Sequence, residues 1–238
     1  AFTALLIISG GIGFFVLGDV ANNRRWKQLT VHTRIVLTSS AALIIGGALV
    51  LKSMGGIGWL AALFQSITAR TAGFNTVDIG SLPAASQLVL MLLMFVGASP
   101  GSTGGGIKTT TAFAIAASVF ALVFRHEPVA FKRKLGNESL LKAFHVLVLA
   151  SSVVVAALFL LLWIEHERFT FLQVAFEAVS AFATVGLSTG ITPSLQDPSK
   201  LVLVVVMFIG RVGPITVATA LKGKESSVKH VEERIIIG

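Results

Sequence analysis

Long apolar runs restrict this chain to folds that a lipid bilayer can solvate. With their flanks, they occupy 35–51, 88–98, 143–164 and 201–210, which is too many and too long for one soluble core in 238 residues. Only 13% of the residues are charged, compared with about 25% in soluble domains. Runs of this kind are typical of membrane-spanning helices. The expected fold class is therefore an all-α integral membrane protein.

Basic residues gather in three segments, and their positions predict the orientation of the chain in the membrane. The net charge of +8 therefore reports orientation, and no nucleic-acid partner is expected. The connections at 75–87 and 188–200 carry only Asp78, Asp197 and Lys200 and are expected outside. The chain has no cysteine, so neither a disulfide nor a thiolate metal site can form. The three groups expected on the cytoplasmic side are Arg24, Arg25, Lys27 and Arg34; Arg125, Lys132, Arg133, Lys134 and Lys142; and Lys222, Lys224, Lys229 and Arg234.

The chain contains an internal repeat with an offset of 113 residues. Thr71-Ala72-Gly73 corresponds to Thr184-Val185-Gly186, and the apolar runs that follow also match. At the same offset Leu88-Val89-Leu90 meets Leu201-Val202-Leu203. A gapless match over this distance indicates two copies of one structural unit.

Each copy predicts a spanning helix, a shorter amphipathic helix, a loop that begins Thr-x-Gly, and a second spanning helix. The short helices have about 12 to 14 residues, fewer than the roughly 20 that span the hydrocarbon. Irregular backbone at membrane depth is tolerated where it lines a water-filled path, so re-entrant loops and a pore are expected. Interfacial helices followed by ordinary loops remain the alternative. The first copy assigns the four parts to 35–54, 59–70, 71–75 and a helix that begins near 86, and the second assigns them to 140–164, 170–183, 184–189 and 199–221.

The segment 97–111 is rich in glycine and interrupts what would otherwise be one helix from 87 to 124. Such a helix would be about 57 Å long, roughly twice the hydrocarbon thickness, so a break is required. The break is either a loop within the membrane or a simple cytoplasmic turn. The segment also nearly fits a phosphate-binding loop, because Gly101 and Gly106 have the required spacing, but Ile107 displaces Lys108 by one position. A nucleotide hydrolase is therefore an alternative function, and a non-conducting membrane scaffold is another.

Four ionisable side chains fall within or beside apolar or short-helix segments. Arg211 follows directly on the run 201–210, and a charge at that depth usually faces water or a partner. It is a candidate barrier to a permeating cation, and the alternative is a purely structural arginine satisfied by Glu177 and by carbonyls. Glu177 and Arg70 lie on the two short helices, so each is expected to be paired. His145 has no second ligand nearby and is expected to be an ordinary interfacial residue.

These motifs together resemble the Ktr/Trk/HKT superfamily of potassium transporters, and the resemblance covers essentially the whole chain. In that family four helix–pore-loop–helix units surround one pore with pseudo-four-fold symmetry. The resemblance implies that 1–22 is the last transmembrane helix of the second unit, 23–134 the third unit with a broken second helix, 135–222 the fourth unit and 223–238 a cytoplasmic tail. The matching motifs are Thr71-Ala72-Gly73-Phe74, Thr184-Val185-Gly186-Leu187, Gly97 to Thr109, and Phe208 to Thr216.

The resemblance also implies a function, namely potassium uptake across the plasma membrane by a multi-pass protein that is no enzyme and needs no cofactor. Potassium is the transported ion, with sodium as a second candidate. Backbone carbonyls would replace the hydration shell of the ion. The implied selectivity filter comprises Thr71, Ala72, Gly73, Phe74, Thr184, Val185, Gly186 and Leu187, with potassium contacts from the first three residues of each loop. The implied gate comprises Gly97, Ser99, Pro100, Gly101, Gly104, Gly105, Gly106, Lys108 and Arg211.

Two partners follow from the same resemblance. Members of the family form homodimers in the bilayer, and they dock on a cytosolic ring of RCK-type nucleotide-binding regulatory subunits. The C-terminal segment from Arg234 to Gly238 resembles part of the dimer contact.

Thr184-Val185-Gly186 matches the filter of potassium channels but continues Leu187-Ser188. Fewer ordered carbonyls imply looser discrimination of potassium from sodium.

Overall fold

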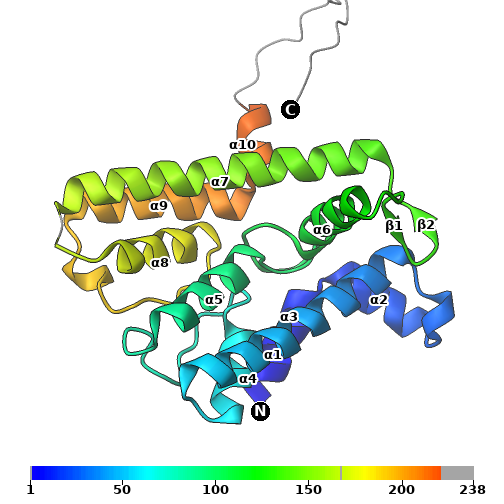
Figure 1. Cartoon of the computed structure of the whole chain (residues 1–238), viewed down its shortest axis with the longest axis horizontal. Coiled ribbons are helices and arrows are strands. Elements are labelled where there is room, and N and C mark those ends of the chain that lie inside the picture. Colours follow the sequence, from blue (N-terminus) through cyan, green and yellow to red (C-terminus); the bar gives the residue numbers. More distant parts are fainter. Residues whose placement is uncertain (1, 167, 221–238) are drawn as a thin grey trace, which may run out of the picture.

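The structure is a computed structural model that describes residues 2–166 and 168–220. Its described part is almost entirely helical (Figure 1), as the sequence predicts. The expected tail at 223–238, with the proposed dimer contact, lies outside the described residues. The elements in chain order are α1 (Phe2–Ile12), α2 (Phe14–Asn22), η1 (Trp26–Gln28), α3 (Val31–Gly55), α4 (Trp59–Thr68), α5 (Ala84–Phe95), α6 (Thr109–Val123), β1 (Val129–Ala130), β2 (Arg133–Lys134), α7 (Asn137–Glu165), α8 (Phe171–Phe182), η2 (Thr192–Ser194), α9 (Asp197–Val212) and α10 (Pro214–Ala220).

Two of the described helices, α3 and α7, are by themselves long and apolar enough to cross a membrane. They contain 25 and 29 residues, with mean hydropathies of 2.0 and 2.8 over their most apolar windows. Helix α3 begins at Thr30, whose side chain accepts a hydrogen bond from the backbone N–H of Thr33, and it ends at Gly56 in a left-handed conformation. Both end signals are typical of stable helix termini. The two spanning helices that open the repeats are thus where the sequence predicts them.

The short helices α4 and α8 contain 10 and 12 residues. At 1.5 Å per residue they are about 15 and 18 Å long, roughly half of the hydrocarbon thickness. Helix α8 begins with a capping box, in which Thr170 and Gln173 satisfy each other's backbone N–H groups. Its whole C-terminal part, from Val174 to Phe182, is buried. Each short helix therefore directs its C-terminal end, and the loop behind it, into the protein interior.

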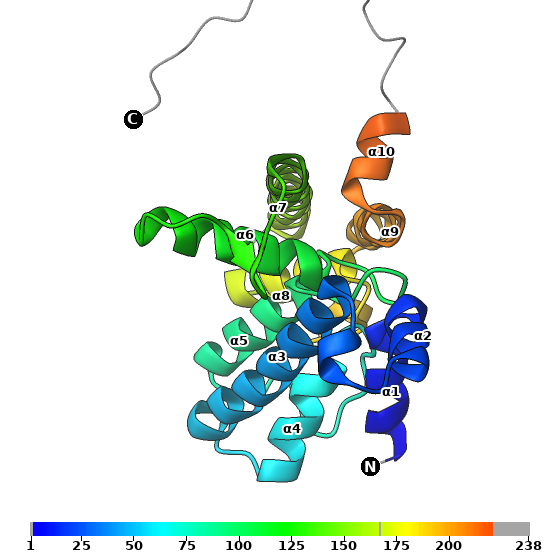
Figure 2. The same cartoon turned by 90° about the vertical axis from the view of Figure 1, so that its right-hand side faces the viewer.

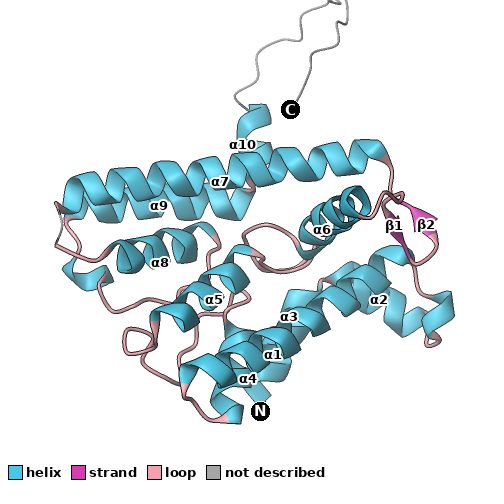
Figure 3. Cartoon of the chain, in the orientation of Figure 1, coloured by secondary structure: helices cyan, strands magenta, loops and turns pink. Residues whose placement is uncertain are grey.

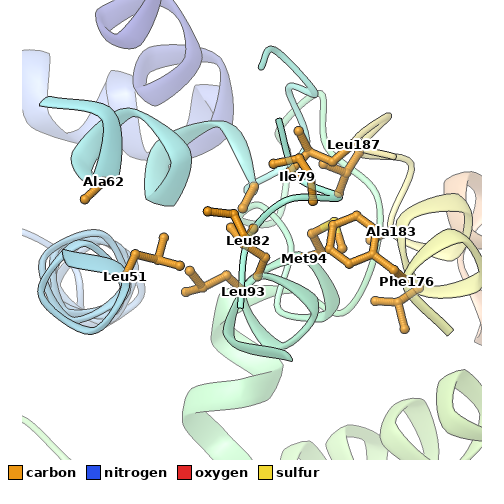
Figure 4. Close-up of a cluster of buried hydrophobic side chains, with 13 residues drawn as sticks. Leu51, Ala62, Ile79, Leu82, Leu93, Met94, Phe176, Ala183 and Leu187 are labelled. Carbon is orange, nitrogen blue, oxygen red and sulfur yellow. The ribbon is translucent and has the colours of Figure 1, made fainter. Parts of the chain in front are cut away.

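A buried apolar cluster joins the two repeats. Helix α5 packs against both α3 and α8. Figure 4 shows Leu93 and Met94 of α5 between Leu51 of α3 and Phe176 of α8. In the view turned by 90° (Figure 2), α1 and α2 lie beside α3, and α7 and α9 lie beyond α8. This core fixes the positions of the loops that follow α4 and α8.

The second helix of each repeat is broken, and so is the helix at the start of the chain. One transmembrane helix was expected at 1–22, but the described residues 2–22 form α1 and α2 with a bend of 94° at Gly13. The sequence predicts one continuous helix at 199–221. This prediction is wrong, because Gly213 separates α9 from α10. Gly13 (φ 89°, ψ 146°) and Gly213 (φ 97°, ψ 134°) have nearly the same conformation, which side-chain-bearing residues rarely adopt. Between α5 and α6 the break is the predicted glycine-rich segment, drawn as loop in Figure 3.

A short antiparallel hairpin between α6 and α7 was not expected from the sequence. Val129 pairs with Lys134 and Ala130 with Arg133. The two turn residues, Phe131 and Lys132, both have positive φ angles (49° and 66°). Such turns usually contain Asn-Gly, so Phe-Lys gave no recognisable signal. The hairpin brings the basic residues of this connection close to the start of α3 (Figure 1).

Candidate functional site

The loops after α4 and α8 have the same unusual backbone conformation. Thr71 and Gly73 have φ angles of 70° and 77°, and their repeat partners Thr184 and Gly186 have φ angles of 53° and 90°. The residue between them has a negative φ in both loops. Positive φ is uncommon for threonine, so its occurrence at equivalent positions indicates one shared loop structure. Alternating left- and right-handed residues turn successive N–H groups to one side of the chain, and the carbonyls then face the other side.

The two loops lie in direct backbone contact. A methyl group on Gly73 would collide with the carbonyl oxygen of Val185, and it would lie 3.2 Å from the Cα atom of Gly186. A methyl group on Gly186 would lie 3.8 Å from the Cα atom of Gly73. The residues that end the two motifs differ, because Leu187 is buried (1% exposed) and Phe74 is 56% exposed. Glycine is therefore required in the first loop by close approach as well as by its φ angle.

Glu177 of α8 braces the second loop from behind. Its Oε1 atom accepts hydrogen bonds from the Ser188 hydroxyl (2.7 Å) and from the backbone N–H (3.0 Å) and hydroxyl (3.2 Å) of Thr189. Its Oε2 atom accepts one from the Thr192 hydroxyl (2.7 Å). The side chain is only 5% exposed, and four donors satisfy its charge. Glu177 also borders a cavity of about 300 Å³ that Thr184, Gly186 and Met207 help to line.

The first loop is braced in another way. The hydroxyl oxygen of Thr68 accepts a hydrogen bond from the backbone N–H of Phe74 (2.8 Å), and the Thr68 carbonyl accepts one from Ala72 (3.0 Å). The residue that corresponds to Glu177 is Phe64, which cannot hold the loop by hydrogen bonds. Arg70 is buried and donates to the Ser40 hydroxyl of α3 (3.1 Å). Glu177 of α8 and Arg70, which follows α4, thus have separate partners that the sequence does not assign.

The glycine-rich segment returns to the two threonines that begin the loops. A methyl group on Gly104 would collide with the Thr71 hydroxyl, and one on Gly105 would collide with the Thr184 hydroxyl. Among the described residues, no group hydrogen-bonds to the Thr184 hydroxyl, although it is buried. Only glycine lets the segment approach so closely. Gly106 lies beside Ala183 in the same region.

Other residues of this segment tie it to the start of the chain. Ser99 donates from its backbone N–H to the carbonyl of Gly11 (3.0 Å), and the N–H of Phe14 donates to the carbonyl of Gly101 (3.1 Å). The segment closes on itself through a bond from the N–H of Gly97 to the carbonyl of Ile107 (2.8 Å). The predicted gate residues therefore divide between two environments. Gly104, Gly105 and Gly106 face the Thr-x-Gly loops, and Pro100 and Gly101 face the bend at Gly13.

Two cationic side chains bind consecutive carbonyls of the glycine-rich segment. Arg211, in the last turn of α9, donates from its guanidinium to the carbonyl of Thr103. Lys108 donates from Nζ to the carbonyl of Gly104 (2.6 Å). Arg211 is exposed and Lys108 is partly buried. In the structural alternative, Glu177 and carbonyls satisfy Arg211. The carbonyl contact is present at Thr103, but the Glu177 part is wrong, because that carboxylate accepts from Ser188, Thr189 and Thr192 instead.

The alternative of a phosphate-binding loop lacks its structural context. Helix α5, rather than a strand, precedes Gly101, and an isolated bridge between Val96 and Ile107 closes the segment. A phosphate-binding loop follows a strand and leads into a helix. No group of three or more His, Cys, Asp or Glu side chains that could hold a metal ion occurs in 2–166 or 168–220.

The break at Gly13 is the feature of this region that sequence reasoning missed. A signal for it exists, since Gly10 and Gly13 have the same spacing as Gly210 and Gly213. Gly97 and Pro100, which follow α5, have the same spacing with proline in the second position. The start of the chain thus carries the same Gly-x-x-Gly pattern as the break at Gly213.

The sequence matches a known protein family and curated relatives. The profile of the family "TrkH: Cation transport protein" matches residues 26–230. The Ktr system potassium uptake protein B of Vibrio alginolyticus is 39% identical over 98% of this chain and 54% of its own length. The protein of the same name from Bacillus subtilis (strain 168) is 39% identical over 98% of this chain and 55% of its own length. The chain therefore spans about half the length of the curated relatives it matches.

The fold also matches a solved structure, the crystal structure of the potassium transporter TrkH from Vibrio parahaemolyticus. The TM-score is 0.73 with 20% sequence identity, over 92% of this chain and 51% of the other. At this identity the likeness concerns the fold alone. It confirms an all-α membrane fold for this chain.

Proposed function

The chain belongs to the TrkH family of cation transport proteins, and on that premise we propose that it supplies part of a potassium uptake pathway across the plasma membrane. It is a membrane protein, with two described helices able to cross the bilayer. The observation that carries the proposal is the pair of Thr-x-Gly loops with matched positive φ angles, in contact at the centre of the chain. A soluble enzyme has no need for such a pair.

The two loops serve as walls of a selectivity filter. The carbonyls of Thr71, Ala72 and Gly73 in one loop, and of Thr184, Val185 and Gly186 in the other, replace water around potassium. The alternation of φ supports this role, because it turns successive carbonyls to one side. Phe74 and Leu187 are the last residues of the two filter loops. Sodium is the second candidate ion, since fewer ordered carbonyls lower discrimination.

A closed ring needs more than these two loops. We expect the remainder of a longer protein to contribute two further helix–pore-loop–helix units, giving pseudo-four-fold symmetry. The chain's coverage of about half of its relatives supports this expectation. On this assignment 23–134 and 135–222 are the third and fourth units, and 1–22 ends the second. The breaks at Gly13 and Gly213 support the last point, because they have one conformation.

The glycine-rich segment serves as a gate below the filter, with Arg211 and Lys108 as its cationic supports. Its contacts with Thr71 and Thr184 support this role, because a segment at that place obstructs the path of an ion that leaves the filter. A scaffold without conduction explains neither these contacts nor the matched loops. The structure does not support a nucleotide hydrolase, because helix α5 and not a strand precedes the glycine-rich segment.

We further propose two partners, a second copy of the protein in the bilayer and a cytosolic ring of RCK-type nucleotide-binding subunits. The basic connections at 24–34 and 125–142 support a cytoplasmic contact surface. Regulation through such a ring would act on the gate through α6, the helix that directly follows it.

Flux through the complete protein tests the proposal. The full-length protein, reconstituted in liposomes, should carry potassium in preference to sodium. Gly73→Ser should abolish uptake or raise sodium flux, because its side chain collides with the neighbouring loop. Gly186→Ser should raise sodium flux through backbone strain at a φ of 90°.

Gly190→Ser is the matched control, since Gly190 has a φ of 94° and open space around it. It should lose stability without a change in ion preference. If both filter substitutions leave potassium uptake and ion preference unchanged, the filter assignment is wrong. If the wild-type protein carries no monovalent cation, the proposed function itself fails.

A further inference from the structure

A basic pocket lies between the start of α3 and the hairpin that precedes α7. We call this feature, lined by Lys27, Thr30, Arg34, Phe131, Arg133 and Lys134 together with neighbouring apolar side chains, the basic pocket. Its volume is about 570 Å³, enough for a phosphate group and the atoms next to it. Four cationic side chains from two connections, about a hundred residues apart in sequence, line one cavity.

The positive charge of the basic pocket is only partly neutralised. Lys134 pairs with Glu127, which lies outside the lining. Asp19 is the other nearby carboxylate, and it accepts hydrogen bonds from the backbone N–H and hydroxyl of Thr30. Within 2–166 and 168–220, Lys27, Arg34 and Arg133 form no salt bridge. Three cations without a carboxylate partner therefore face a cavity whose lining holds no acidic residue.

Arg34 is held in place at the basic pocket by contacts with two other lining residues. Its guanidinium donates from one terminal nitrogen to the carbonyl of Lys27 (2.5 Å) and lies 6.0 Å from the centre of the Phe131 ring. Its Nε atom is buried and has no hydrogen-bond partner among the described residues. A buried N–H without a partner is costly, so the packing around Arg34 leaves one donor of this side chain unsatisfied.

The position of the basic pocket favours a membrane lipid over a soluble anion. It lies at the N-terminal ends of α3 and α7, the two described helices able to span the bilayer alone. Trp26 is 47% exposed, and its ring lies edge-on to Phe131 with 6.2 Å between centroids. Exposed aromatic rings beside cationic groups are typical of the membrane–water interface. Leu29, Val31 and Leu135 add apolar surface to the lining.

We propose that the basic pocket binds the phosphate headgroup of an anionic phospholipid. Arg34 and Arg133 hold the phosphate from α3 and from the hairpin, and Lys27 lies at the same cavity. The lipid then links the start of α3 to the connection between α6 and α7. The proposal rests on membrane insertion and on the basic pocket, and it is independent of ion conduction.

Native mass spectrometry of the full-length protein tests the site. Purified protein is titrated with dioleoylphosphatidylglycerol or, for comparison, dioleoylphosphatidylcholine. The wild type should retain the anionic lipid preferentially. Arg34→Gln with Arg133→Gln should weaken its binding about thirtyfold, because each basic residue near an anionic headgroup contributes about a fivefold change.

A matched control removes the same charge from the same two connections. Arg25 and Lys132 lie outside the lining of the basic pocket. The double variant Arg25→Gln with Lys132→Gln should therefore change lipid binding less than twofold. Arg133 is exposed, so Arg133→Gln alone should fold and should weaken lipid binding about fivefold. This single variant replaces the double variant in the test if the double variant does not fold. Thermal unfolding of each variant in detergent verifies folding.

Three outcomes overturn the proposal. Equal lipid binding by both double variants shows unspecific attraction to net positive charge. Equal retention of the two lipids shows that the basic pocket does not select an anionic headgroup over a zwitterionic one. Displacement of the anionic lipid by millimolar inorganic phosphate assigns the basic pocket to a soluble anion. Because none of these measurements involves flux, they leave the proposed uptake function untouched.

Discussion

Arg211 combines a charge within an apolar helix with a hydrogen bond to the glycine-rich segment. If it borders the ion path, its repulsion of a cation about 8 Å away is about 2 kcal/mol at an effective dielectric near 20. That energy corresponds to a rate lower by a few tens of times. We predict that Arg211→Gln raises maximal potassium flux by about that factor, whereas Arg211→Lys stays near wild type.

Uptake of potassium by cells that lack other uptake systems, with the amount of folded protein measured in parallel, checks this prediction. Loss of folded protein in both variants would favour a structural role for Arg211. Equal flux at normal abundance would show that its charge does not shape the barrier.

Glu177 is the residue on which the second Thr-x-Gly loop depends. Glu177→Gln keeps the shape of the side chain but loses the charge that four donors address, at a cost of about 1–3 kcal/mol. We predict a lower ratio of potassium to sodium permeability, because the loop behind Gly186 loosens. The ratio is measured from ion fluxes in liposomes.

Glu165 provides the control for this prediction. It is also buried, at 1% exposure, but it accepts a hydrogen bond from the backbone N–H of Gln196 and pairs with Arg168 at the end of α7. Glu165→Gln should cost comparable stability and leave ion preference unchanged. An equal change of ion preference in both variants would make the Glu177 effect a general loss of stability.

At the scale of elements, a substitution that adds one methyl group to the glycine-rich segment should displace it from the Thr-x-Gly loops. Gly105→Ala would press against the Thr184 side chain and lie 3.0 Å from the carbonyl oxygen of Ala183. We predict that the segment moves away from the filter and that flux rises about tenfold, as expected if about 1.4 kcal/mol of closure is lost. Shortening the segment should act in the same direction.

Gly136→Ala, where the methyl group meets open space, is the comparison for Gly105→Ala. Both variants are assayed for potassium flux and for abundance in the membrane. Unmodified flux in a folded Gly105→Ala protein would remove the segment from the gating mechanism.

The bend between α1 and α2 makes a stability prediction. Gly13→Ala forces a residue with a Cβ atom to a φ of 89° and places that atom 2.5 Å from the carbonyl oxygen of Pro100. We expect a loss of about 1–2 kcal/mol or more. Gly18→Ala, in the middle of α2 with open space around it, should instead stabilise by about 0.5–1 kcal/mol. Thermal unfolding of the full-length protein measures both, and a stabilising Gly13→Ala would contradict the bend.

Element by element, the sequence predicts the helices better than it predicts their breaks. Helices α3, α4, α7 and α8 lie within a few residues of the expected ranges, because length and hydropathy decide them. The break at Gly213 was missed, although Pro214 follows it directly, because the apolar residues on both sides favour one continuous helix. The hairpin at 129–134 was missed because its turn lacks the usual residues.

In the site, sequence reasoning could place the repeated Thr-x-Gly loops but not their surroundings. An offset of 113 residues and two glycines identify Gly73 and Gly186 as equivalent. The partners of Glu177 and Arg70 lie up to 30 residues away on other segments, and only the packed structure brings them together. The same holds for the approach of Gly104 and Gly105 to the two threonines.

At the scale of the whole molecule, the basic connections predict how the chain is oriented in the membrane. The chain has no cysteine, so single cysteines can be introduced without background within it. Cysteines placed in 24–34, 125–142 and 222–238 should resist impermeant thiol reagents in intact cells, because these segments face the cytoplasm. Cysteines in 75–87 and 188–200 should react. Labelling of the first group from outside would invert the orientation.

The bond between Arg211 and Thr103 joins residues 108 positions apart. During synthesis at about 5–20 residues per second, Arg211 leaves the ribosome roughly 5–20 s after its partner carbonyl. The glycine-rich segment must therefore wait for the last helices before it can settle, and the bonds to Gly11 and Phe14 are the first that hold it. A nascent chain arrested before α9 would contain the segment with Lys108 but without Arg211. The contact between the glycine-rich segment and α9 thus forms late in biogenesis, after most of this region has been translated.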